Sequence, residues 1–184
     1  MGNARLLVLG LIACTTAFAG AGFAAAHDIG GTDAAFVAAA RGGDPIPFAY
    51  LGAKHMVTGY DHLLFLVGVI FFLYRLRQIV LYVSLFSLGH SITLLAGVFF
   101  DLHANAFLVD AVIGLSVVYK AFDNLGGFRT LFGVQPDTRA AVLGFGLIHG
   151  LGLATKLQAM SLNPDGLLIN LAAFNVGVEL GQVL

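Results

Sequence analysis

The chain has 184 residues, of which 59% are hydrophobic and only 10% are charged, with a formal net charge of −1. Soluble domains carry roughly a quarter charged residues, so this composition is typical of a membrane protein with one domain. The balanced charge and the lack of a Lys/Arg run argue against a nucleic-acid partner. The single cysteine, Cys14, excludes a disulfide framework and a zinc–thiolate site.

The first 26 residues have the pattern of a secretory signal peptide. Arg5 supplies a positive start, residues 6–13 an apolar core, and the three alanines at 24–26 a small-residue cleavage site. An uncleaved first helix is the alternative interpretation. Residues 27–50 follow as a short polar segment containing aspartates and prolines, which we expect to lie outside the cytoplasm.

Five apolar segments then follow, and each is close to the ~20 residues that a membrane-spanning helix needs. A backbone in lipid must satisfy its own hydrogen bonds, so these segments are predicted to be helices. They are 51–74, 79–100, 105–122, 140–160 and 166–184. The fold class expected is all-α: a polytopic transmembrane helix bundle that forms one domain over residues 51–184, with the lipid bilayer as its surroundings.

Basic residues predict the orientation of this bundle. One side holds five of them: Arg75, Arg77, Lys120, Arg129 and Arg139. The other side holds three: Arg41, Lys54 and Lys156. Cytoplasmic loops are enriched in Lys and Arg, so the first side is predicted to be cytoplasmic. The mature N-terminus would then lie outside a bacterial-type inner membrane.

Three histidines fall near the centres of three different predicted helices: His62, His90 and His149. Ionisable side chains are expensive in hydrocarbon, so they usually face the bundle interior and mark a functional path. Imidazole suits nickel, cobalt, zinc and copper alike. The shared depth therefore predicts that the three side chains converge on one divalent transition-metal site. A lone histidine of this kind can equally be a hydrogen-bonding contact between helices.

Two further residues surround His62. His55 lies seven residues earlier on the same helix face, which places it ~10.5 Å away along the axis of a straight helix. It would be the first ligand met by an ion from outside, or part of a second site, unless Gly59 loosens the turn. Asp61 points ~100° away from His62. It is therefore expected to orient a histidine instead of binding the metal itself.

Three more polar residues are candidates for an exit path or a second shell. Asn175 falls at the centre of the fifth predicted helix, at the depth of the histidines. Glu179 lies in the inner half of the same helix, where it could pair with Lys120 or mark the exit. Asp110 lies in the outer half of the third helix, where a structural role near the surface is the alternative.

Four motifs of this chain resemble those of the HupE/UreJ family of nickel/cobalt permease-like membrane proteins. They are GAKHMVTGYDHLLFL at 52–66, FSLGHSITL at 86–94, FGLIHGLG at 145–152 and FNVGVELGQ at 174–182. The resemblance implies metal-ion uptake or metal supply to an enzyme such as hydrogenase or urease, with nickel or cobalt as the favoured ion. The partners expected are a second copy of the chain in a homo-oligomer or a metalloenzyme-maturation protein. Similar chains usually continue through at least one more helix, so this chain is either a fragment or naturally short.

Two other functions remain open from the residues. Histidines on facing helices at one depth can ligate haem iron in an electron-transfer subunit, with Gly89 and Gly150 making room for the macrocycle. Alternatively, the chain is an accessory subunit of a larger complex, and its polar residues are contacts between helices. Because no P-loop, H-E-x-x-H or G-x-S-x-G motif occurs, we expect neither an enzyme nor ATP-driven transport by this chain.

Overall fold

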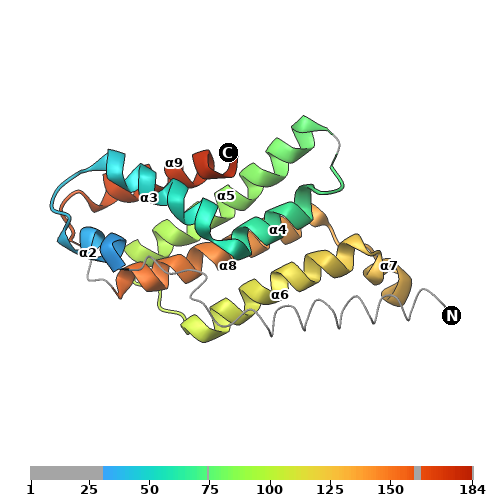
Figure 1. The fold of residues 1–184 in the computed structure, drawn as a ribbon. Helices are drawn as coiled ribbons and strands as arrows, with labels where there is room; N and C mark the ends of the chain where they lie inside the picture. Colours follow the sequence, from blue (N-terminus) through green and yellow to red (C-terminus); the bar gives the residue numbers. More distant parts are fainter. Residues whose placement is uncertain (1–30, 74, 160–162, 184) are drawn as a thin grey trace.

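The computed structural model describes residues 31–73, 75–159 and 163–183, and every regular element in them is a helix (Figure 1). The predicted all-α class is therefore confirmed, whereas the predicted signal peptide lies outside the described residues. The helices are α2 (Gly31–Ala39), α3 (Pro45–Thr58), α4 (Tyr60–Ile70), α5 (Leu76–Phe99), α6 (Ala106–Asn124), α7 (Gly127–Phe132), α8 (Thr138–Gln158) and α9 (Leu167–Val183).

The prediction of one continuous helix over 51–74 is wrong, because the chain breaks at Gly59. α3 ends with the Gly59 amide bonded to the His55 carbonyl, and α4 begins with the Leu63 amide bonded to the Gly59 carbonyl. Gly59 itself is extended, with φ −75° and ψ 95°. A β-carbon at this position would lie 2.6 Å from Nδ1 of His62. Glycine at the break therefore leaves room for the His62 ring.

Two pairs of parallel helices form the centre of the molecule. In the α5–α8 pair, a β-carbon on Gly97 would overlap Ala154, and one on Gly89 would lie 2.5 Å from the Leu143 carbonyl oxygen. In the α3–α9 pair, a β-carbon on Gly181 would lie 2.8 Å from the Ala53 carbonyl oxygen. Small residues at such contacts let helix backbones approach closely, as is common in membrane bundles. Gly146, Gly150 and Ala154, which follow one another at intervals of four on α8, therefore pack against α5.

α6 lies against α4 and α8 and runs antiparallel to α8 (Figure 1). Asp110 near the start of α6 faces Lys156 near the end of α8, with 3.7 Å between carboxylate and ammonium. At the other end, the Tyr119 and Phe145 rings lie 5.1 Å apart. The directions of α5, α6 and α8 thus alternate along the chain, as those of consecutive membrane passes do.

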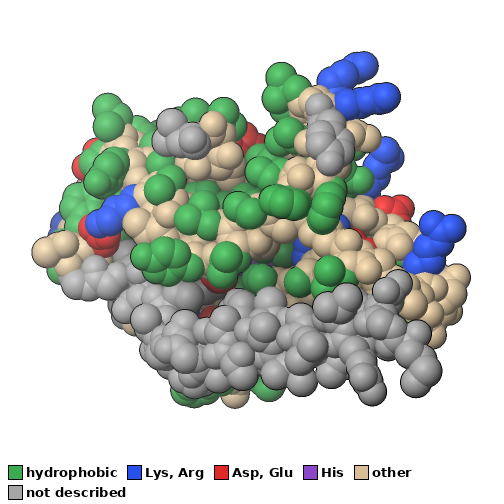
Figure 2. Space-filling view, turned by 45° about the vertical axis from the view of Figure 1, so that its right-hand side comes forward, with side chains coloured by type: hydrophobic (Ala, Val, Ile, Leu, Met, Phe, Trp, Pro, Cys, Tyr) green, Lys and Arg blue, Asp and Glu red, His purple; other side chains and the backbone are tan. Residues whose placement is uncertain are grey.

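Lys120, one of the basic residues that predicted the orientation, is buried near the end of α6. Its ammonium lies 2.6 Å from the Asp123 carboxylate, so its ionic partner is Asp123 and not Glu179. Gln135, from the segment after α7, donates a hydrogen bond to the other oxygen of Asp123. Most Lys and Arg side chains visible in Figure 2 gather toward its right-hand side, the end that carries the α4–α5 turn and α7.

Among the described residues, two helices are long and apolar enough to cross a membrane by length and composition, namely α5 and α8. α4 and α9 are shorter apolar helices. Large hydrophobic side chains also lie on the exterior, for example Phe107 with 87% of its surface exposed. Figure 2 shows such side chains spread over much of the visible face. An apolar exterior of this kind is typical of contact with lipid or a partner.

Candidate functional site

Four buried imidazoles from four helices meet inside the bundle: His55 of α3, His62 of α4, His90 of α5 and His149 of α8. We call these four residues the histidine cluster. The ring centre of His62 lies 5.0 Å from that of His55, 5.7 Å from that of His90 and 4.9 Å from that of His149. The centres of His55 and His90 are 6.2 Å apart. His62, His90 and His149, which the sequence placed at one depth, therefore belong to one group of buried rings in the structure.

His55 joins the cluster, contrary to the separation expected on a straight helix. The break at Gly59 redirects the chain between the two residues, so that their rings meet edge to face. The break also changes the position of His62, which lies in the first turn of α4 and not at the centre of a helix. His90 and His149 do lie near the middles of α5 and α8, as predicted.

Hydrogen bonds determine which nitrogen of two of these rings carries a proton. Nδ1 of His149 lies 2.7 Å from the Phe145 carbonyl oxygen. A carbonyl only accepts, so Nδ1 donates and Nε2 of the neutral ring holds the lone pair that a metal needs. Nδ1 of His62 lies 3.0 Å from a carboxylate oxygen of Asp61, so an ionised Asp61 has the same effect there. The contact expected for Asp61 is thus present.

The position of Asp61 suits a negative charge. It is the second residue of α4, and the N-terminus of a helix carries a partial positive charge that stabilises a carboxylate. The residue is also buried beside His62, with 9% of its surface exposed. Asp61 therefore supports the cluster from the side of α4, through His62.

Phenylalanine rings enclose the cluster, and the sequence analysis missed this role. The Phe86 ring lies 5.0 Å from that of His149 and 5.9 Å from that of His62. Phe65 packs 5.9 Å from His149, and Phe174 of α9 packs 5.9 Å from His55. Two side chains that are three or four residues apart lie on one helix face. Phe86 and His90 are four apart, and His62 and Phe65 are three apart. That spacing is the signal that could have revealed the aromatic wall.

The three remaining candidates are not among the four clustered rings. Asp110 is exposed near the start of α6 beside Lys156, and Glu179 is exposed on α9. Asn175 lies at the centre of α9, and within the described part of the chain its buried amide nitrogen and oxygen have no hydrogen-bond partner. Of the three, only Asn175 therefore has buried polar atoms that an ion or water could bind.

The spacing of the rings suits a small ion. Rings that bind one ion have centres ~5 Å apart, because the metal–nitrogen bond is ~2 Å and the ring centre lies ~1 Å beyond. In the described residues, no three His, Cys, Asp or Glu side chains are arranged as they stand to hold a metal ion. Binding of one ion would thus require the imidazole rings to leave the positions they have here.

The haem hypothesis relied on open space beside Gly89 and Gly150, and helix packing fills that space. A β-carbon on Gly150 would overlap the carbonyl oxygen of His90, and one on Gly89 would lie 2.5 Å from that of Leu143. The space beside both glycines is therefore occupied by the backbone of the neighbouring helix. This packing offers no room for a macrocycle at either position and does not support the haem alternative.

A sequence model described as HupE / UreJ protein matches residues 31–184. This match covers the four motifs and all members of the histidine cluster. Searches of curated proteins and of solved structures gave no significant match. HupE/UreJ proteins are generally associated with nickel and cobalt transport, and are a transporter or accessory family. The chain belongs to the HupE/UreJ family.

Proposed function

We propose that the chain is an inner-membrane permease or metal-binding protein for a divalent transition metal, with nickel or cobalt as its substrate. The observation that carries the proposal is the convergence of four buried imidazoles from four helices. The centres of neighbouring rings in this cluster lie 4.9–6.2 Å apart. Buried ionisable groups in a membrane bundle are costly, and they are typical of substrate and ion pathways. Membership of a nickel- and cobalt-associated family supports the choice of ion.

In this proposal the ion binds to neutral imidazoles of the histidine cluster. The Phe145 carbonyl holds His149, and Asp61 holds His62, in the tautomer with the proton on Nδ1. In that tautomer the lone pair on Nε2 is available to the ion. Asp61 also adds negative charge close to the cation without being its ligand. Hydrogen-bonding partners of this kind orient a metal-binding histidine and raise its basicity.

We place the chain in the inner membrane with five passes: α3 with α4, then α5, α6, α8 and α9. The alternating directions of α5, α6 and α8 support this topology. The end with Arg75 and Arg129 would face the cytoplasm, and α2 would face the outside. Two of the three basic residues on the outer side are paired with acidic groups, Lys54 with Asp33 and Lys156 with Asp110. Their pairing strengthens the difference in charge between the two sides.

We further propose that Asn175 and Glu179 form the exit path of the ion after it leaves the histidine cluster. The two residues are four apart on α9, one helical turn, and therefore lie on one face. Glu179 is exposed, and its carboxylate suits the release of a cation at the surface. Asp110 would act only at the outer surface, where it is paired with Lys156.

The test is metal accumulation in cells that make equal amounts of the wild type, His62→Ala and Asp61→Asn. We expect His62→Ala to abolish nickel or cobalt uptake, and Asp61→Asn to weaken it while the bundle stays folded. His103→Ala is the matched control, because His103 lies on an exposed segment between α5 and α6. Equal accumulation in all four proteins would refute the permease mechanism.

A second measurement separates permease from accessory subunit. Purified protein is titrated with nickel, cobalt, zinc and copper, and its metal content is determined by elemental analysis. Binding by the isolated chain that His62→Ala removes supports a metal site within this chain. Failure of the isolated chain to bind any of the four ions would favour the accessory role, and a Soret absorption band would instead indicate haem.

A further inference from the structure

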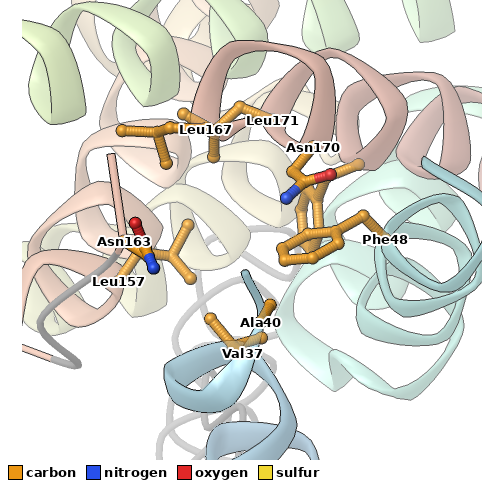
Figure 3. Close-up of a pocket in the computed structure, with 9 residues that line it drawn as sticks. Val37, Ala40, Phe48, Leu157, Asn163, Leu167, Asn170 and Leu171 are labelled. Carbon is orange, nitrogen blue, oxygen red and sulfur yellow. The ribbon is translucent and has the colours of Figure 1, made fainter. Parts of the chain in front are cut away.

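A pocket lies between α2, α3, α9 and the end of α8 (Figure 3), at the end of the bundle away from α7 and the α4–α5 turn (Figure 1). The space between its lining residues is about 400 Å³ only when the open solvent at its mouth is counted. Val37 and Ala40 line it from the side of α2, and Leu167, Asn170 and Leu171 line it from α9 (Figure 3). Several lining residues are partly exposed, so the pocket reaches the surface of the molecule.

Asn170 holds the mouth of this pocket in shape. Its side-chain oxygen accepts a hydrogen bond from the Asp44 amide at 2.7 Å, and its nitrogen donates to the Gly42 carbonyl at 3.0 Å. The Asp44 amide and the Gly42 carbonyl both belong to the segment between α2 and α3. The buried amide therefore fastens that segment to α9 and keeps α2 beside the pocket.

Phe174 connects the pocket to the histidine cluster. It is buried, with 2% of its surface exposed, and it is one of the residues that line the pocket. Its ring centre also lies 5.9 Å from that of His55. One aromatic ring thus contacts both the pocket and the first of the four histidines. His55 in turn lies against His62 and His90.

We infer that this pocket is the outer vestibule of the metal path, and that Phe174 is the hydrophobic barrier between the vestibule and His55. The inference rests on the function proposed above. Apolar constrictions in membrane proteins control the passage of ions by excluding water. In the position observed, Phe174 separates the vestibule from the imidazoles. A rotation of the Phe174 ring would let an ion in the vestibule replace a bound water molecule with the His55 imidazole.

The first test blocks the vestibule in the folded protein. Cys14→Ser removes the native thiol, and Leu167→Cys then places a thiol in the pocket, while Leu168→Cys places one on its exposed neighbour outside the lining. Intact cells are treated with a membrane-impermeant, bulky methanethiosulfonate reagent, and nickel uptake is measured. We expect modification at position 167 to cause loss of uptake and modification at position 168 to leave uptake unchanged. Lack of modification at 167, or full uptake after it, would overturn the inference.

The second test alters the barrier. Phe174→Ala should raise the initial rate of uptake above that of the wild type. Phe65→Ala is the matched control, since Phe65 is equally buried and lies at the same 5.9 Å from a cluster histidine, but does not line the pocket. A rate for Phe174→Ala that equals or falls below the Phe65→Ala rate would contradict a barrier role. His62→Ala is run alongside: if it still takes up nickel, the proposed function fails. If it does not, a negative result concerns the vestibule alone.

Discussion

Replacing Gly150 with alanine should separate two of the cluster histidines. The added β-carbon would overlap the His90 carbonyl oxygen and lie 2.8 Å from its carbonyl carbon. Carbon atoms in ordinary contact are ~3.5–4.0 Å apart, so α5 must move by roughly 1 Å away from α8. Overpacking of this kind costs about 1–3 kcal/mol of stability.

The same movement should impair metal binding, because metal–ligand distances tolerate only about ±0.2 Å. A shift of roughly 1 Å takes His90 away from an ion held by His149. We expect a loss of nickel affinity of roughly 10- to 100-fold, the range for residues that support metal ligands indirectly. The assay is calorimetric titration of the purified protein, together with its thermal unfolding in detergent.

Gly144→Ala is the control on the same helix. A β-carbon at Gly144 would meet no atom within 4 Å, so this variant should keep the affinity and stability of the wild type. If Gly150→Ala binds nickel as tightly as Gly144→Ala and unfolds at the same temperature, the close contact of α5 and α8 does not position His90. The reasoning would then be wrong.

Three further expectations follow from the remaining geometry. Lys120→Met leaves Asp123 charged and buried without its cation, so the free energy of unfolding should fall by about 3–5 kcal/mol in a denaturant titration. Replacing both residues with apolar ones should recover most of this loss. An unchanged midpoint for the single variant would show that the ion pair does not stabilise the fold. Leu76→Cys, next to the basic α4–α5 turn, should react with impermeant thiol reagents only after cells are opened, and labelling in intact cells would reverse the topology. Nickel affinity should fall as pH is lowered, because protons compete with the metal for neutral imidazoles, and an affinity independent of pH across the histidine range would argue against imidazole ligands.

The helical class and the polar residues of the site were predictable from the sequence, because both follow from local properties. Long apolar runs with few charges predict helices in lipid, and a histidine within such a run is conspicuous wherever it points. Small residues spaced four apart on one helix favour close packing of helices in membranes, and Gly146 and Gly150 of α8 pack against the backbone of α5.

The tertiary structure alone decided how these residues meet. A glycine within a predicted helix does not by itself end it, so the sequence could not show that the chain breaks at Gly59 and brings His55 to His62. Nor could it place Phe174 of α9 against His55, or direct the buried Lys120 to Asp123. A hydropathy pattern reports how each segment interacts with its solvent. Which side chains touch depends on the packing of segments far apart in the chain, and that packing is set by the shapes of the surfaces that the helices present to one another.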